Sequence, residues 1–400
     1  MTFEKPGPAR YHALDAMRGI CACLVVLYHV NSTGYIANAP FVRNAWLFVD
    51  YFFVLSGFVI SASYGQRLRE GFPVSRFMFL RLGRIYPLHL FVILIYLLFE
   101  LAKPLLGSSN LAAGAPFTEP RSLSDLGQAL GFLNIFGLRE FNGYNPPSWS
   151  IAAEFWTYAI MAGLIVALRR TRFLAPIVVA VVSSVLLVTN GDEYLHRTFV
   201  FSLPRALLGF ALGYALFEIF DRWQHPRFAK SVATVLEIAM IGVIVTYLTL
   251  LDDGVWTMLA PFLFLPTIYL FALSRGVPSA LLQSRVMQTL GLLSYSIYLT
   301  HQFIIARIAD IAALAGQRGL PVGGVVDVGG TPVKVLGTPG NPLLADLLSI
   351  GAVCAVIAAS FVTYYLIENP GRDWSRKFAK KIWPATPTGA SRSSGSGSTL

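Results

Sequence analysis

The sequence predicts an all-α fold, a polytopic membrane helical bundle with about ten transmembrane helices. Of its 400 residues, 55% are hydrophobic and only 13% are charged, whereas soluble domains carry about 25% charged residues. The mean hydropathy is +0.61. The apolar residues are concentrated in runs close to the ~20 residues that cross a bilayer as a helix. These observations place the chain among integral membrane proteins.

Ten apolar runs are candidate spans. Gly or Pro interrupts several of them, which membrane helices tolerate. The candidate spans are residues 13–33, 43–64, 84–103, 148–168, 173–190, 198–220, 231–250, 255–274, 289–313 and 344–368.

The basic residues predict the orientation, because cytoplasmic loops of membrane proteins are rich in Lys and Arg. With the N-terminus inside, most of the 31 basic residues fall in inner segments, and the outer turns "NGDEY" and "LLDDG" are acidic. An even number of spans places both termini in the cytoplasm. The net charge of +10 therefore reflects topology in the cell (inner) membrane, and a nucleic-acid partner is not expected.

The remaining segments complete the domain organisation, which is a membrane domain over 1–382 and a low-complexity, disordered tail over 383–400. In the outer segment 104–147, Ser122 and Asp125 have capping-box spacing and predict a short interfacial helix. The segment 315–343 is either a functional lid or a mobile connector. Cleavage of a signal peptide is not expected, because charged residues interrupt the first apolar run. The three cysteines lie in apolar runs without metal-site spacing, so no metal is predicted.

The first candidate span contains Arg18 and His29, which are costly in hydrocarbon. Eleven residues are three helical turns plus about 20°, so both side chains project from one face, about 16.5 Å apart along the axis. Ala22 and Val25 lie between them on that face. Asp15 is three residues before Arg18 and can pair with it. Polar residues in register favour a functional site over separate structural roles.

Two carboxylates lie near the predicted outer ends of spans. Asp50 is either an interfacial acid or a group that orients a histidine. Glu154 follows Ser150 and precedes Tyr158 at helical spacing, in "PPSWSIAAEFWTY". A carboxylate at this depth should pair or titrate abnormally, which favours a functional role for Glu154.

Two further groups of polar residues accompany later spans. Arg76, Arg81 and Arg84 lie at the predicted cytosolic mouth of the third span, where they either set topology or bind phosphate groups. Near the end of the chain, "LSYSIYLTHQ" places Ser294, Tyr298 and His301 along one helix face. That stripe is either a hydrogen-bonded seam between helices or part of a substrate site.

Six motifs, in order, resemble those of the acyltransferase-3 family of integral membrane acyltransferases. They are Arg18 and His29 with ten residues between them, "FVDYFFVLSGF", "RLGRIYP", "WSIAAE", "SYSIYLTH" and "IENP". The resemblance covers nearly all of residues 10–375. Two positions depart from the family pattern, since Phe48 stands where Gly is frequent and Phe155 where a second Glu often follows the position of Glu154.

The resemblance implies a ten-span O-acyltransferase that modifies the cell envelope. Such an enzyme moves an acyl group, expected to be acetyl, from cytosolic acyl-CoA to a hydroxyl of an extracytoplasmic glycan or related acceptor. The expected partners are acyl-CoA, a carbohydrate or lipid-linked glycan, and membrane lipid. No permanently bound cofactor is expected, because acyl-CoA is a donor substrate.

The residues suggest a mechanism for this chemistry. Arg76, Arg81 and Arg84 would hold the phosphates of coenzyme A, and its arm would follow the Arg18–His29 face. His29 is the expected general base, oriented by Asp50 or Glu154 as in a catalytic triad. The expected acceptor or oxyanion groups are Trp149, Ser294, Tyr298 and His301.

Two alternatives stay open. The acyl group can pass through a covalent intermediate on His29. The buried charges also fit a proton-coupled glycan or solute permease, although no internal repeat supports a secondary transporter. Acyl-CoA consumption distinguishes the enzyme from the permease.

Overall fold

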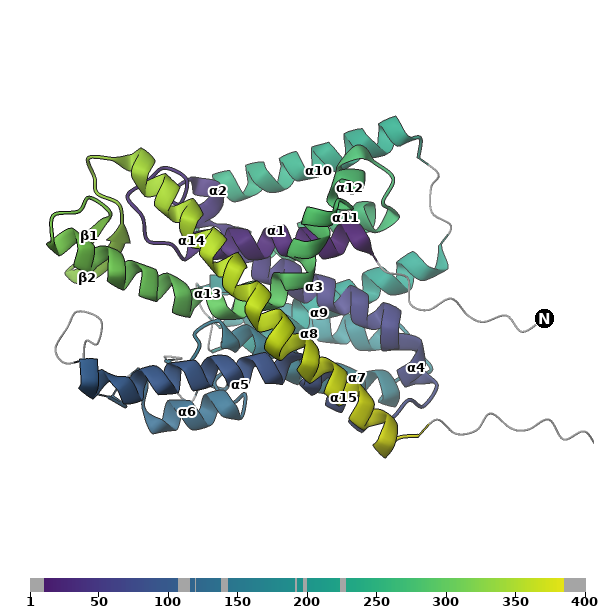
Figure 1. The fold of residues 1–400 in the computed structure, drawn as a ribbon. Coiled ribbons are helices and arrows are strands. Elements are labelled where there is room, and N and C mark those ends of the chain that lie inside the picture. Colours follow the sequence, from purple (N-terminus) through teal and green to yellow (C-terminus); the bar gives the residue numbers. More distant parts are fainter. Residues whose placement is uncertain are drawn as a thin grey trace, which may run out of the picture.

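The computed structural model describes residues 11–106, 116–118, 120–137, 143–190, 193–196, 200–223 and 228–384. It confirms the predicted fold class, since long helices pack side by side as one bundle and the one small sheet described is a two-stranded hairpin at one end (Figure 1). Of the predicted tail 383–400, only residues 383 and 384 lie among the described residues, so its disorder stays a prediction.

The elements follow one another in this order along the chain. The first half contains α1 His12–Tyr28, α2 Pro40–Arg43, η1 Ala45–Leu47, α3 Phe48–Ile60, η2 Ser61–Gly65, α4 Gln66–Arg69, α5 Val74–Leu106, α6 Leu123–Leu130, α7 Ser148–Ala167 and α8 Leu174–Thr189. The second half contains η3 Tyr194–His196, α9 Ser202–Arg222, α10 Lys230–Leu250, η4 Val255–Leu259, α11 Ala260–Leu273, α12 Val277–Leu282, α13 Arg285–Gln317, β1 Gly323–Val328, β2 Thr331–Leu336, α14 Pro342–Thr363, η5 Tyr364–Glu368 and α15 Asn369–Ile382.

Within the described residues, eight helical segments are long and apolar enough to cross a membrane. They correspond to eight of the ten predicted spans. The other two predictions, 13–33 and 173–190, coincide with α1 and α8, which have 17 and 16 residues. At 1.5 Å per residue these helices are about 24–26 Å long, somewhat shorter than a ~30 Å hydrocarbon core. The crossing of the bilayer by α1 and α8 stays a prediction.

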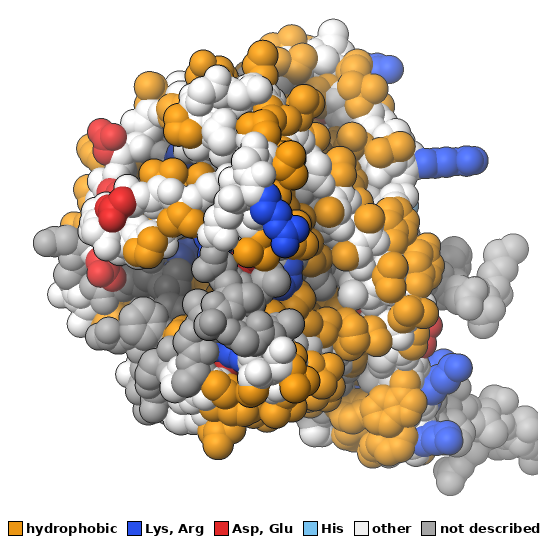
Figure 2. Space-filling model, turned by 60° about the vertical axis from the view of Figure 1, so that its left-hand side comes forward, with side chains coloured by type: hydrophobic (Ala, Val, Ile, Leu, Met, Phe, Trp, Pro, Cys, Tyr) orange, Lys and Arg blue, Asp and Glu red, His pale blue; other side chains and the backbone are white. Residues whose placement is uncertain are grey.

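The surface of the bundle is apolar over large areas. Figure 2 shows hydrophobic side chains spread over the face in view, and α8 and α10 expose many branched residues such as Val181, Val185, Val235 and Ile238. A soluble protein rarely exposes contiguous apolar areas of this kind. This surface fits contact with lipid.

Two helices are longer than predicted. Helix α5 has 33 residues and begins at Val74, ten residues before the predicted start at 84. It therefore carries Arg76, Arg81 and Arg84 on its first three turns. Helix α13 also has 33 residues, about 50 Å at 1.5 Å per residue. Its far end lies beside β1 and β2, at one end of the bundle (Figure 1).

The two outer segments contain regular structure. Ser122 caps α6 in a capping box with Asp125, as predicted. In the segment 315–343, strands β1 and β2 form an antiparallel hairpin that pairs Val328 with Thr331, where no secondary structure was predicted. Gly329 and Gly330 make the turn, and both have positive φ, as the favoured two-residue hairpin turns require.

Side-chain pairs join the ends of helices that the predicted topology places on the same side. Glu218 at the end of α9 bonds Arg69 of α4 at 2.7 Å, and Asp310 of α13 bonds Lys334 of β2 at 2.6 Å. The first pair joins predicted inner ends and the second joins predicted outer ends. Both pairs are consistent with the predicted topology, whose orientation in the membrane stays a prediction.

Candidate functional site

Arg18 lies where α1 crosses α13. The two helices approach closely because Gly19 and Gly291 face each other's backbone, and a Cβ on either would meet main-chain atoms at less than 3 Å. Arg18 then reaches α13, where Nε donates to Ser294 Oγ at 2.8 Å and Nη2 donates to the Gly291 carbonyl at 3.1 Å. Asp15 pairs with Arg18 at 3.3 Å, as the sequence predicted.

Arg18 lines a pocket that brings together polar residues from five helices, α1, α3, α5, α7 and α13. We call it the arginine pocket. It encloses about 930 Å³ of space, including its open side. Its polar lining residues are Arg18, Ser56, Arg81, Arg84, Ser150, Glu154, Tyr158, Ser294, Tyr295 and Tyr298. Six of the predicted site residues therefore meet in one pocket.

Glu154 accepts two hydrogen bonds in this pocket, from Ser56 Oγ at 2.7 Å and from the Tyr158 hydroxyl at 2.5 Å. These donors hold the carboxylate away from His29. Glu154 thus lies in the pocket lined by Arg18, Arg81 and Arg84, and the prediction that it orients the His29 imidazole is wrong for this structure. The next residue, Phe155, packs on Phe132 with ring centroids 5.3 Å apart, so it belongs to the apolar core.

The three predicted phosphate-binding arginines differ in their surroundings. Arg81 lines the pocket and lies over the Tyr64 ring, 5.0 Å from its centroid. Arg84 also lines it but donates to Glu368 at 2.7 Å. Arg76 lies over Phe72 and is not part of the lining.

His29 lies in a second pocket, which we call the histidine pocket. It encloses about 720 Å³ including its open side, and its lining residues are Val25, Tyr28, His29, Trp46, Val49, Pro146, Pro147, Trp149, His196, Arg205, Tyr298 and Gln302. The predicted residues Trp149 and Tyr298 lie here beside His29. Aromatic rings form much of the wall.

The backbone of α1 fixes the imidazole of His29. Nδ1 lies 2.8 Å from the Val25 carbonyl oxygen, four residues earlier. Because a carbonyl only accepts, Nδ1 carries the hydrogen, and Nε2 of the neutral ring keeps its lone pair. This is the arrangement that a general base requires, and here a carbonyl provides it in place of the predicted carboxylate.

His301 stands behind His29, with ring centroids 4.8 Å apart. Its Nδ1 donates to the Tyr298 carbonyl at 2.5 Å. Its buried Nε2 has no hydrogen-bond partner among the described residues. His301 is fully buried and lines neither pocket, so the structure places it next to His29 and away from both pocket surfaces.

Asp50 does not reach His29 either. Both of its oxygens bind the guanidinium of Arg205, at 2.8 Å and 2.6 Å, and both side chains are 1% exposed. Arg205 in turn lies 5.2 Å from the ring centroids of Trp46 and Trp149. The prediction that Asp50 orients the imidazole is therefore wrong. The sequence analysis assigned no role to Arg205. Its position inside the apolar run 198–220 could have indicated a buried, paired arginine.

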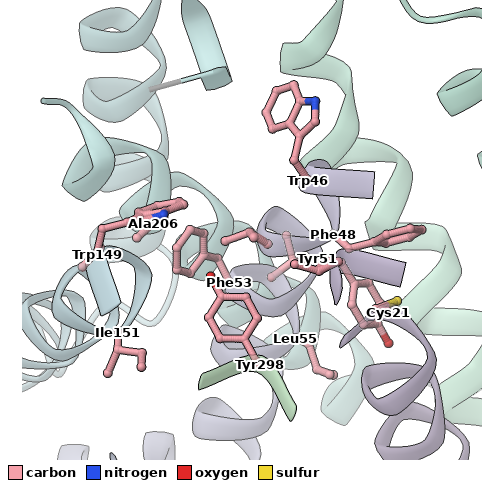
Figure 3. Close-up of a cluster of buried hydrophobic side chains, with 14 of the residues drawn as sticks. Cys21, Trp46, Phe48, Tyr51, Phe53, Leu55, Trp149, Ile151, Ala206 and Tyr298 are labelled. Atoms are coloured by element: carbon pink, nitrogen blue, oxygen red, sulfur yellow. The ribbon is translucent and has the colours of Figure 1, made fainter. Parts of the chain in front are cut away.

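Val49 and Tyr298 line both pockets. The Tyr298 hydroxyl hydrogen-bonds Ser150 Oγ at 2.8 Å and joins α13 to α7. The Tyr298 ring packs edge-on against Phe52, with centroids 5.9 Å apart, and Figure 3 shows it close to Phe53 in the middle of the buried cluster. A thin layer of side chains thus separates the two pockets.

The face of α1 between Arg18 and His29 is closed. Ala22 is fully buried and packs in one cluster with Leu293 and Ile297 of α13. The sequence analysis predicted that the coenzyme A arm follows this face. Because Ala22 is packed against α13, that prediction is wrong for this structure. The two pockets instead adjoin at Val49 of α3 and Tyr298 of α13, which line both. Among the described residues, no group of three or more His, Cys, Asp or Glu side chains is placed to hold a metal ion.

Comparisons with known proteins identify the family of the chain. The family model Acyl_transf_3, described as an acyltransferase domain, matches residues 11–367. Acyltransferase MdmB from Streptomyces mycarofaciens is 28% identical over 396 residues, which cover 91% of this chain and 92% of that protein. A Rhizobium radiobacter protein described as "Protein 2 in picA locus" is 28% identical over 201 residues, 47% of this chain and 97% of that protein. No solved structure matches the chain. The chain belongs to the acyltransferase-3 family and is a membrane acyltransferase.

Proposed function

We propose that the protein transfers an acyl group, expected to be acetyl, from cytosolic acyl-CoA to a hydroxyl on the outer side of the cell membrane. One observation carries this proposal. Two pockets, one lined by arginines and the other containing His29, meet at Val49 and Tyr298. A donor and an acceptor can then approach one point from opposite sides.

The arginine pocket is suited to the donor. Coenzyme A carries phosphate groups, and guanidinium groups bind phosphate oxygens strongly. Arg81 is the best placed of the three α5 arginines, because it lines the pocket without a carboxylate partner within 4 Å among the described residues. Arg84 shares its charge with Glu368. Arg18 lies deeper, at the α1–α13 crossing, where its charge would favour an anionic or thioester-bearing arm.

The histidine pocket is suited to the acceptor. Tyr28, Trp46 and Trp149 give it flat, partly apolar walls, and aromatic rings with a polar edge suit ligands that are part apolar and part hydrophilic. A sugar ring of a glycan or a lipid-linked glycan has this character. We therefore propose a carbohydrate hydroxyl as the acceptor.

The chemistry follows from the two placements. Nε2 of His29 takes the proton of the acceptor hydroxyl as its oxygen forms a bond to the thioester carbon. The carbon–sulfur bond then breaks, and the coenzyme A thiolate receives the proton from the imidazolium. The Tyr298 hydroxyl, at the boundary of both pockets, would donate a hydrogen bond to the oxyanion of the tetrahedral intermediate. Transfer is direct in this scheme.

Sidedness tests the proposal. Inverted and right-side-out vesicles are prepared from cells that express the protein with a C-terminal epitope tag, and protease access to the tag gives the orientation. Radiolabelled acetyl-CoA is added outside each kind. Alkali-labile label should appear in glycans or lipids of inverted vesicles, and membranes with His29→Gln should lack it. Equal labelling of both kinds of vesicle would contradict the trans-membrane route, and absence of acetyl-CoA consumption in both would favour a permease.

A further inference from the structure

A third cavity is lined by α1 and α3 residues other than those of the two pockets. We call it the α10 cavity. It encloses about 1290 Å³ including its open side. Its walls come from α1, α3, α10, α11 and α12, and its lining residues are Met17, Ile20, Cys21, Leu24, Phe41, Phe48, Tyr51, Ile241, Ile244, Val245, Phe264, Thr267, Phe271, Pro278, Leu281, Leu282, Ser284 and Met287.

The cavity is closed inside and open toward the surface. Its inner wall is buried, since Cys21, Phe264 and Phe271 are 1–5% exposed. Ile241 and Leu281, on α10 and α12, are 42% and 67% exposed. The opening therefore lies between α10 and α12, two elements on the apolar surface of the bundle. A ligand would enter sideways from the bilayer.

The lining selects an aliphatic ligand with one polar point. Nearly all of the wall is hydrocarbon, and a water molecule needs two to four polar partners, which this wall does not offer. The hydroxyl groups of the wall are those of Ser284 at the open end, Thr267, which donates to the Leu263 carbonyl at 2.9 Å, and Tyr51. Tyr51 is 1% exposed and lies beside Cys21 (Figure 3), and its oxygen has no hydrogen-bond partner among the described residues. A buried hydroxyl is costly when it has no partner, so a ligand oxygen is expected there.

The open end of the cavity has polar and basic residues that can bind a lipid head group. Ser284 lines the cavity and Arg285 follows it, and both are exposed at the junction of α12 and α13. This junction is at a predicted inner end, where basic residues meet anionic lipid phosphates. We propose that the α10 cavity binds a membrane phospholipid, with one acyl chain between α10 and α1 and the phosphate at Ser284–Arg285. The proposal does not depend on the direction of acyl transfer.

Photo-crosslinking tests the site. The purified full-length protein is placed in nanodiscs containing phosphatidylglycerol with a diazirine in its acyl chain, irradiated, digested and mapped by mass spectrometry. Adducts are expected on peptides containing Cys21 and Tyr51, which lie away from the outer surface. Ile244→Trp should fill the cavity and lower these adducts at least about 10-fold. Val243→Trp, on the opposite face of α10, is the matched control and should leave them unchanged.

Two results would overturn the site. One is labelling of α10 without labelling of the Cys21 and Tyr51 peptides in the unaltered protein, which means that lipid stays outside. The other is equal labelling in Ile244→Trp and Val243→Trp. Gel filtration and thermal unfolding check each variant, and Leu282→Trp replaces Ile244→Trp if that variant fails to fold, because it fills the same cavity from α12. Tyr51→Phe should lower the adducts roughly 2- to 10-fold, the effect of one lost hydrogen bond.

Discussion

The hydroxyl of Tyr298 hydrogen-bonds Oγ of Ser150 at 2.8 Å, and this contact lies where the arginine pocket and the histidine pocket meet. Ser150 also donates to the Pro147 carbonyl at 3.0 Å, so the start of α7 holds the hydroxyl pair in place. In the proposed reaction the Tyr298 hydroxyl must release Ser150 to reach the oxyanion. The pair would therefore position the donor of that hydrogen bond before the thioester arrives.

Tyr298→Phe should lower kcat about 10²- to 10³-fold, the usual loss on removing one oxyanion donor. KM for acyl-CoA should change little, because the ring remains. Ser150→Ala should cost less, since it frees the Tyr298 hydroxyl without removing it. Initial rates of coenzyme A release over a range of donor concentrations separate the two parameters. If Tyr298→Phe leaves kcat unchanged, the Tyr298 hydroxyl does not stabilise the oxyanion.

His29→Gln should reduce turnover at least about 10²- to 10⁴-fold, because glutamine does not accept a proton near neutral pH. Membrane insertion and the unfolding temperature in detergent should stay near normal. His89→Gln is a matched control, since His89 is buried and, like His29, hydrogen-bonds a carbonyl, Ala129 O at 2.9 Å, but lines neither pocket. Comparable turnover of both variants at matched expression would exclude His29 as the base.

Arg81→Ala should raise KM for acyl-CoA roughly 10- to 150-fold, the cost of one charge-assisted contact. Arg76→Ala should have a smaller effect, because Arg76 lies outside the lining. Donor affinity is measured by competition between labelled and unlabelled acetyl-CoA. If Arg76→Ala and Arg81→Ala weaken donor binding equally, the arginines act through general positive charge and not through a defined site.

Arg84→Ala is expected to act through the fold as well as through the donor. Glu368 is buried and also accepts from Ser296 Oγ at 2.7 Å, so the variant leaves a buried carboxylate without its cation. Arg84→Ala should therefore lower the unfolding temperature, and adding Glu368→Gln should restore part of it without restoring donor affinity. Recovery of donor affinity in the double variant would show that Arg84 matters only to folding.

The fold class was predictable because each helix that crosses a bilayer needs a run of about 20 apolar residues, and such runs can be found one at a time in the sequence. That Ser294 and Tyr298 share one helix face was also predictable from their spacing, but their meeting with Arg18 and Glu154 in one pocket was not, because it depends on which spans are neighbours. The partners of Asp50 and His29 were not predictable either. The partner of Asp50 depends on how α3 and α9 cross. His29 bonds the backbone carbonyl of Val25, and a backbone acceptor is present at every residue, so the sequence does not indicate it.

The β1–β2 hairpin was missed by the sequence analysis for a different reason. Alternating valines around Gly329 and Gly330 carry a hairpin signal, but it is short and lies in a segment rich in Gly and Pro. Its stability comes from packing on α13, which the local sequence does not reveal. For example, Lys334 of β2 reaches Asp310 of α13 at 2.6 Å.

The Asp50–Arg205 pair gives a final prediction, which separates support of the fold from chemistry. Arg205→Met should destabilise the protein by about 3–5 kcal/mol, because it leaves a buried carboxylate without a cation. Asp50→Leu together with Arg205→Met removes both charges, and well-packed apolar replacements of buried ion pairs are often neutral or stabilising. The double variant should therefore regain most of the unfolding temperature in detergent. Its acyltransferase activity should also return in part, because Trp46 and Trp149 keep their places beside His29. A stable double variant without any activity would instead show that Arg205, which lines the histidine pocket, contacts the acceptor directly.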